Sequence, residues 1–284
     1  MKQIQDAYIV AATRTPIGRS HKGFFRNTRP DDLLATTLKA VMAQAPGLDP
    51  QAVEDVICGC AIPEAQQGLN VARIGAVLAG LPNSVGGITV NRFCASGLSA
   101  VAMAADRIRV GEADVMIAAG VESMSMVPMM GNSPSLSPSI FAPDSDVGIA
   151  YGMGLTAERV AQQWKVSREA QDAFAVESHR RALAAQQAGE FAAEITPIEV
   201  TDRGLDLATG QTTARSRTVS LDEGARADTT LEGLAKLRTV FAARGSVTAG
   251  NSSQTSDGAG ALILASEAAV KRFGLTPLAR FVSY

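Results

Sequence analysis

Short apolar segments alternate with stretches of helical periodicity, and this alternation restricts the fold more than any other feature of the chain. The apolar segments span residues 7–12, 55–61, 88–90, 115–119 and 260–265, and the helical stretches span 30–45, 70–79, 95–110 and 266–273. Strands that are apolar along their whole length occur in sheets buried on both faces, and most such sheets are parallel because helices connect their strands. The sequence therefore predicts an α/β fold with helices on both faces of a mostly parallel sheet.

The character of the sequence changes after Gly120. Residues 124–154 are rich in Met, Ser, Pro and Gly without a sustained period, which is typical of an ordered excursion outside the core. The next segments predict helices at 156–164, 167–189 and 229–237, the last opened by a capping box at Thr229, and short strands at 194–200 and 216–220. We predict one domain from residues 1–120 and 246–274, with an α+β loop domain inserted at 121–245.

Cys94 lies where the strand 88–90 ends and the helix 95–110 begins. A thiol at that turn faces the positive end of the helix dipole and free backbone N–H groups, and both favour the thiolate, which is the form that attacks carbonyl carbons. The alternative is a buried cysteine that serves as a small apolar residue. Spacing alone leaves these two interpretations equally weighted.

Residues 91–98, Asn-Arg-Phe-Cys-Ala-Ser-Gly-Leu, resemble the nucleophile segment of thiolases, the enzymes that make or cleave 3-ketoacyl-CoA. Further segments at 120–125, 153–158, 233–237 and 248–253 also resemble thiolase sequence. Residues 251–254 are more similar to the thiolases of fatty acid β-oxidation than to those that synthesise acetoacetyl-CoA. The resemblance implies a five-stranded sheet with the loop domain inserted after the fourth strand, and it makes residues 275–284 the first strand of a truncated C-terminal domain.

The resemblance also implies roles for individual residues, with Cys94 as the catalytic nucleophile that becomes an acyl thioester. Coenzyme A or acyl-CoA would be a substrate and not a permanently bound cofactor. Its implied contacts are Ser253 at the pantetheine amide, Arg226 near the adenosine 3′-phosphate, Met153 and Phe241 along the channel, and Ala249. The simpler alternatives are a turn role for Ser253, a solvated charge at Arg226 and core positions for Met153 and Phe241.

Thiolases carry a second half of similar fold, and none of its motifs occurs in this sequence. The motifs are Asn-Glu-Ala-Phe, a Gly-His-Pro whose His activates the nucleophile, and Cys-x-Gly-Gly. The two histidines of the chain, His21 and His179, match no catalytic position, and their polar neighbours predict solvent-facing side chains. One alternative is therefore a truncated or split thiolase half, inactive alone, that acts as a CoA-binding or interaction subunit and pairs with a separate C-terminal-half subunit. A ketoacyl synthase of related fold is disfavoured, because residues 91–98 and 248–253 both look like thiolase sequence.

The composition limits which binding partners and which cell compartment we expect for the chain. A net charge of −2 without a basic block argues against nucleic acid, and no apolar run is long enough for a membrane span. Strand-like sequence from residue 7 leaves no room for a targeting peptide. Cys58 and Cys60 lack the second ligand pair of a zinc site, so we expect both in the core and no metal. Three cysteines without a disulfide framework suit the cytoplasm, and the resemblance implies a homodimer or homotetramer.

Overall fold

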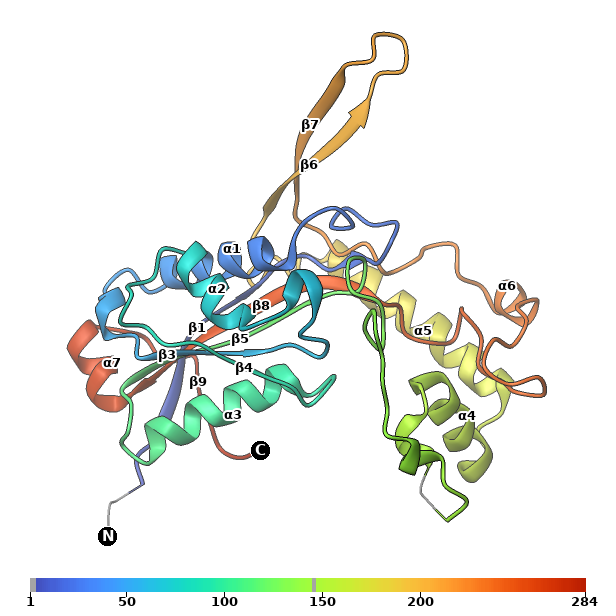
Figure 1. The fold of residues 1–284 in the computed structure, drawn as a ribbon, viewed down its shortest axis with the longest axis horizontal. Helices are drawn as coiled ribbons and strands as arrows, with labels where there is room; N and C mark the ends of the chain where they lie inside the picture. The colour runs from blue at the N-terminus through green and yellow to red at the C-terminus, as the bar shows by residue number, and fades with distance from the viewer. Residues whose placement is uncertain (1–3, 145–146) are drawn as a thin grey trace. The chain divides into compact units, whose positions relative to one another are not determined.

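The computed structural model of the chain describes residues 4–144 and 147–284. Contacts divide it into two compact units (Figure 1). The first unit comprises Met1–Asn132, Ala193–Glu223 and Ser256–Tyr284, and the second comprises Ser133–Ala192 and Gly224–Thr255. The units and the predicted domains overlap without sharing boundaries, and the inserted domain at 121–245 remains a prediction.

One mixed sheet forms the centre of the first unit (Figure 1). Among the described residues it has seven strands, in the order β4-β3-β5-β8-β1-β9 with β2 beside β8. The strands are β1 (Ala7–Arg14), β2 (Gly18–Arg19), β3 (Asp55–Gly59), β4 (Ile88–Val90), β5 (Val115–Ser123), β8 (Ser256–Ser266) and β9 (Ala279–Arg280). β3 pairs in parallel with β4 and β5, whereas β8 is antiparallel to β5 and β1. The strands β1, β3, β4 and β5 therefore share one direction that β8 opposes, which confirms the mostly parallel sheet.

The five predicted strands correspond to β1, β3, β4, β5 and β8. The sheet gains two further strands, β2 and β9, which are two residues long each. The strand expected within 275–284 is shorter than predicted, because only β9 forms there, and Ala279 of β9 pairs with Ile9 of β1.

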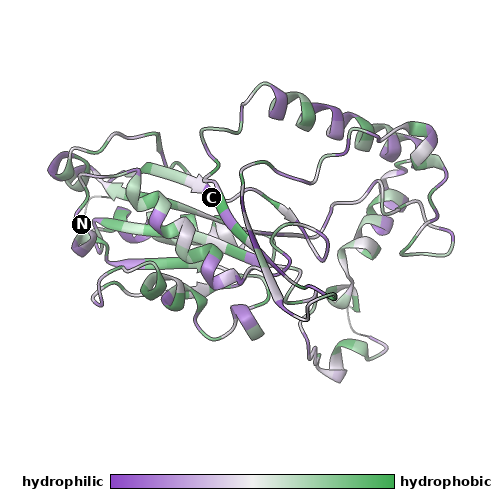
Figure 2. Ribbon diagram, turned by 90° about the horizontal axis from the view of Figure 1, so that it is seen from above, coloured by the Kyte–Doolittle hydropathy of each residue, from purple (hydrophilic) through white to green (hydrophobic). Residues whose placement is uncertain are grey.

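Alternate residues of β5 face two separate apolar clusters. Val115, Ile117 and Ala119 belong to the cluster that contains the buried residues of α1 (Pro30–Ala43) and α2 (Val71–Leu78). Met116 and Ala118 belong to the cluster that contains Ala100, Ala104 and Ala105 of α3 (Ser96–Arg109). The strand is thus buried on both faces, as its unbroken apolar run predicts. Figure 2 shows hydrophobic residues along the strands of this sheet.

Capping residues determine where several helices begin and end. Ser266 caps α7 (Glu267–Phe273), and Gly274 ends that helix in the left-handed region with φ of 62°. The capping box predicted at Thr229 is wrong by one residue, because Thr230 provides the cap of α6 (Leu231–Ala235). None of the helices in the described ranges combines the length and the apolar character that a membrane crossing needs.

A hairpin of β6 (Ile198–Leu205) and β7 (Thr212–Val219) belongs to the first unit. Its ladder runs without a shift from the pair Ile198–Val219 to the pair Leu205–Thr212. Ile198, Val200 and Val219 are buried at its base, and the outer residues are exposed. The strands predicted at 194–200 and 216–220 reach only this base, because the outer half has no apolar pattern.

The second unit is built from helices around a polar centre. It contains α4 (Met153–Trp164), α5 (Arg168–Gln187), α6 and the 3₁₀ turns η3 (Pro138–Phe141) and η4 (Val147–Ala150). Glu158 and Asp172 are each only 4% exposed. Glu158 accepts backbone N–H groups of Ser246 and Val247 at 2.9 Å, and Asp172 accepts from Arg168 Nε at 2.8 Å and Asn251 Nδ2 at 2.9 Å. The helices predicted at 156–164 and 167–189 are confirmed.

Candidate active site

Cys94 lies in the turn between β4 and α3. Since this turn follows the last residue of β4, it lies at the edge of the sheet where the parallel strands β3 and β4 end. The Cys94 side chain is exposed, so the buried-cysteine alternative is wrong. The first N–H groups of a helix lack intrahelical partners and form the positive end of its dipole. The turn therefore presents an accessible sulfur at a helix end that favours negative charge.

Gly59 allows the start of α3 to approach the end of β3. A Cβ atom on Gly59 would lie 2.4 Å from the carbonyl carbon of Ser96 and 2.5 Å from the nitrogen of Gly97. Gly120 pairs with Gly59 across the sheet, and a Cβ there would lie 3.7 Å from the Gly97 Cα. A side chain at position 59 would therefore displace the turn that carries Cys94.

The residue before the cysteine has an unusual backbone conformation. Phe93 has φ of 46°, a left-handed value that costs a bulky residue about 1–3 kcal/mol. The Ser96 hydroxyl donates to the Phe93 carbonyl oxygen at 2.6 Å and accepts the Arg92 N–H at 2.8 Å. On the other side, the Phe93 N–H donates to Asn91 Oδ1 at 2.8 Å. Side-chain hydrogen bonds thus hold the turn on both sides of Phe93.

The other two cysteines are core residues, as predicted. Cys58 and Cys60 are 0% and 1% exposed. Burial raises the pKa of Cys60 to about 12 and also raises the pKa of Cys58. Both therefore remain thiols at neutral pH, and the thiol is not the nucleophilic form. Across residues 4–144 and 147–284, His, Cys, Asp and Glu form no group of three that could hold a metal ion.

The two histidines have separate local roles. His21 is exposed with φ of 62°, and its N–H donates to Ser125 Oγ at 2.7 Å. His179 on α5 is half-buried, and its Nδ1 accepts the Arg226 N–H at 3.1 Å. The prediction of solvent-facing side chains is thus right for His21 and wrong for His179, because the 224–230 loop packs against α5 at that position.

The five predicted coenzyme-binding residues all belong to the second unit, whereas Cys94 belongs to the first. Met153 and Phe241 are 62% and 43% exposed, so the core alternative for them is wrong. A Cβ on Gly154 would lie 2.2 Å from the Phe241 ring, which places this ring against the start of α4. The Phe241 ring therefore packs against Gly154, the residue that follows Met153.

The remaining three lie on exposed loops. Ser253 and Ala249 are exposed, and Ser253 Oγ donates to the Gln254 carbonyl oxygen at 3.3 Å. The loop before them is fixed by Asn251, which accepts the Thr248 N–H at 2.7 Å. Arg226 forms an ion pair with Asp228 at 2.8 Å. The charge of Arg226, which was predicted to contact the 3′-phosphate of coenzyme A, is thus already paired within its own loop.

Comparison with known proteins decides the family. The model of the thiolase N-terminal domain matches residues 7–268. The chain belongs to the thiolase family. It is 47% identical to a 3-ketoacyl-CoA thiolase of Bacillus subtilis (strain 168), over 99% of this chain and 71% of that protein. It is 44% identical to a 3-ketoacyl-CoA thiolase of Colwellia psychrerythraea (96% and 68% covered) and 44% identical to a beta-ketoadipyl-CoA thiolase of Pseudomonas aeruginosa (97% and 70% covered).

Family membership makes this chain an acyltransferase of the thiolase type. It also removes the ketoacyl synthase alternative, because the match to the thiolase domain spans both the Cys94 turn and the 248–253 loop. The prediction of a thiolase-like α/β fold with a mostly parallel sheet is confirmed. The sheet has seven strands among the described residues where the resemblance implies five, and the inserted loop domain remains a prediction.

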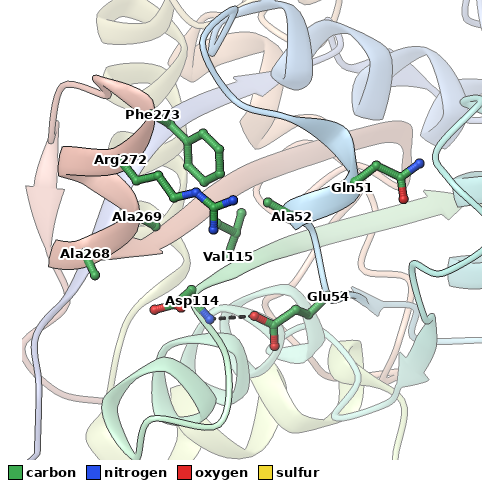
Figure 3. A pocket seen from close by; sticks show the side chains of 9 residues that line it. All are labelled: Gln51, Ala52, Glu54, Asp114, Val115, Ala268, Ala269, Arg272 and Phe273. Atoms are coloured by element: carbon green, nitrogen blue, oxygen red, sulfur yellow. Dashed lines mark hydrogen bonds between the residues drawn. The ribbon is translucent and has the colours of Figure 1, made fainter.

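The first unit has a cavity of about 350 Å³ (Figure 3). Its lining residues include Glu54, just before β3, and Asp114, just before β5, so it opens at the opposite edge of the sheet. Glu54 Oε1 accepts the Asp114 N–H at 2.7 Å, and the Arg272 guanidinium lies over the Phe273 ring at 4.9 Å. The cavity therefore lies at the ends of β3 and β5 opposite to the Cys94 turn.

Sequence reasoning missed the polar residues that shape both units of this thiolase chain. They are Asn91, Glu122, Glu158, Asp172 and Asn251. A signal existed for all but Asp172, because the other four lie inside segments that resemble thiolase sequence. Glu122 follows directly on the buried strand run, and a carboxylate at such a position needs hydrogen-bond donors nearby. Asp172 has no such marker, since it occupies one of many polar positions along α5.

Proposed function

We propose that the chain transfers acyl groups between 3-ketoacyl-CoA and coenzyme A through an acyl thioester on Cys94. The observation that carries this proposal is the exposed sulfur of Cys94 in a hydrogen-bonded turn at the N-terminus of α3. The relatives named 3-ketoacyl-CoA thiolase support the substrate class. Degradation of fatty acids by β-oxidation is the setting that this class suggests.

In thiolysis, the Cys94 thiolate attacks the 3-keto carbon of the substrate. The bond between C2 and C3 breaks, the electron pair stays on C2 as an acetyl-CoA enolate, and this enolate takes up a proton. The thiol of a second coenzyme A then gives up its proton, which balances the proton taken up by the enolate. Its sulfur attacks the thioester carbon, the bond to Cys94 breaks, and the shortened acyl-CoA and the Cys94 thiolate are released. The N–H groups of Arg92, Phe93, Ala95 and Ser96 donate within the turn. A neighbouring backbone N–H that is not bonded in this way would stabilise the oxyanion of each tetrahedral intermediate, at about 3 kcal/mol for one well-placed donor. Condensation of acetyl-CoA is the same sequence in reverse.

Coenzyme A is proposed to bind to exposed residues of the second unit. Ser253 and Ala249 would contact the pantetheine, and Met153 and Phe241 would line its channel. Arg226 would contact the 3′-phosphate, because two of its five N–H donors bind Asp228 and the others are left for phosphate oxygens. The exposure of these side chains supports the proposal.

A homodimer or homotetramer in the cytoplasm is proposed as the working form. Leu98 and Met103 on α3 are 59% and 41% exposed, and a second subunit would cover them. Three free cysteines support a reducing compartment.

Intact-mass measurement after incubation with acetoacetyl-CoA tests the proposal. We expect the chain to gain one acetyl group, the Cys94→Ala variant to gain none, and a Cys94-containing peptide to carry the label. Cys58 and Cys60 serve as internal controls, because both are buried thiols. An unlabelled wild-type chain, or a label that persists in Cys94→Ala, would overturn the proposed nucleophile.

A further inference from the structure

The Asn91 side chain connects the Cys94 turn to a second loop. Its Oδ1 accepts the Phe93 N–H at 2.8 Å, and its Nδ2 donates to the Ala61 carbonyl oxygen at 2.9 Å. Both ends of the amide are therefore used, one on each segment. Asn91 itself is exposed, so apolar packing does not account for its position.

Ala61 is in turn fixed to the end of β5. Its N–H donates to Glu122 Oε2 at 2.7 Å, and Glu122 Oε1 accepts from Gln67 Nε2. Gln67 is fully buried, and its Oε1 accepts the Ser123 N–H at 2.9 Å. A continuous series of hydrogen bonds thus runs from the central strand β5 through Ala61 and Asn91 to the backbone of Phe93.

We propose that Asn91 is a positioning residue for Cys94: it holds Phe93 in its left-handed conformation and ties the nucleophile turn to β5 through Ala61 and Glu122. This inference rests on the proposed role of Cys94 as nucleophile. Without Asn91, Phe93 relaxes toward the negative φ that bulky residues prefer, and the next residue, Cys94, moves with it. A displacement of about 1 Å at a reacting group can cost about 100-fold in rate.

Three variants separate positioning from general damage. Asn91→Ala removes both hydrogen bonds, whereas Asn91→Asp keeps an Oδ acceptor for the Phe93 N–H and loses the donor to Ala61. Asn83→Ala is the matched control, because it deletes the same side chain at an exposed position of the same unit. The thermal unfolding midpoint of each variant shows whether the fold is intact.

Amide hydrogen exchange at Phe93, resolved by NMR, measures the turn directly, and the rate of acylation by acetoacetyl-CoA measures its consequence. For Asn91→Ala we expect exchange at Phe93 to accelerate about tenfold or more and acylation to slow about 100-fold, at an unchanged unfolding midpoint. Asn91→Asp should recover acylation to within about tenfold of the wild-type rate, and Asn83→Ala should match the wild type.

Unchanged exchange at Phe93 in Asn91→Ala would overturn the inference, whatever the acylation data show. So would an Asn91→Asp variant no better than Asn91→Ala. A wild-type chain that is not acylated would defeat the proposed function, and the exchange rates would still decide whether Asn91 holds the turn.

Discussion

The interiors of the two units of this chain are stabilised by different kinds of contact. In the first, apolar residues of α1, α2 and α3 cover both faces of the sheet. In the second, the residues at the centre include two carboxylates, Glu158 and Asp172, which bind backbone and side-chain donors from residues 168 and 246–251. Apolar packing is non-directional and depends on volume, whereas a buried carboxylate depends on every donor being in place. The first unit should therefore respond to lost volume and the second to lost charge.

The largest expected effect is Leu38→Ala, which opens a cavity in the first unit. Leu38 on α1 is fully buried in the apolar cluster, so we expect a loss of about 2–5 kcal/mol in the free energy of unfolding. Urea denaturation followed by circular dichroism measures it. Leu207→Ala makes the same deletion in the same unit at a side chain that is 89% exposed, and should change the free energy by less than about 0.5 kcal/mol. Equal losses of unfolding free energy in both variants would contradict the claim that the first unit depends on its buried apolar volume.

Asp172→Asn should destabilise the second unit by about 2–3 kcal/mol, because it removes the charge that binds Arg168. Trp164, the single tryptophan of the sequence, lies on α4 of that unit, so its fluorescence during urea denaturation reports the effect. Glu177→Gln on the same helix α5 is the control, since Glu177 is bound only in exposed pairs with Arg180 and Arg181. We expect no measurable shift for the control, and a similar shift in both variants would contradict the role of the buried carboxylate.

The smallest expected effect concerns Glu122, a half-buried carboxyl group of the first unit. Burial raises the pKa of this group above its ordinary 4.5. The folded chain then binds the proton more tightly than the unfolded chain does. Its contribution to stability is therefore complete below about pH 4.5 and is lost as the pH rises through the raised pKa.

The Glu122→Gln variant cannot ionise, so we expect its stability to depend less on pH than that of the wild type. We expect the unfolding free energy of the wild type, measured in urea, to fall relative to that of Glu122→Gln as the pH rises from acidic to neutral. Parallel curves would show that Glu122 is charged at no cost, as a well-satisfied carboxylate of the second unit would be.

The positions of the central strands could be predicted because they depend on local pattern. The apolar runs at 115–119 and 260–265 became β5 and β8, and both are buried as expected. The direction of β8 could not be predicted, because an apolar run has the same composition in either direction. β5 also continues to Ser123, since residues 120–123 pair with β8 although their sequence is no longer apolar throughout.

The candidate site shows the same division. Cys94 could be placed at a strand-to-helix turn from its neighbours alone, and the resemblance at 91–98 pointed to its role. The five coenzyme contacts rest on resemblance and remain predictions. Their local surroundings, such as the Phe241 ring against Gly154 or the Arg226 pair with Asp228, follow from loop conformations that no periodicity encodes.

Residues a few positions apart encode the succession of strands and helices along the chain, the apolar faces and the turn that carries Cys94, so the amino-acid sequence was enough to predict them. The exposure of Cys94, and the hydrogen bond from Asn91 to Ala61 that leads on to Glu122, depend instead on how the chain folds. Such contacts join residues about thirty or sixty positions apart in the sequence. They exist because strand order places β3, β4 and β5 side by side, and strand order is a property of the whole sheet.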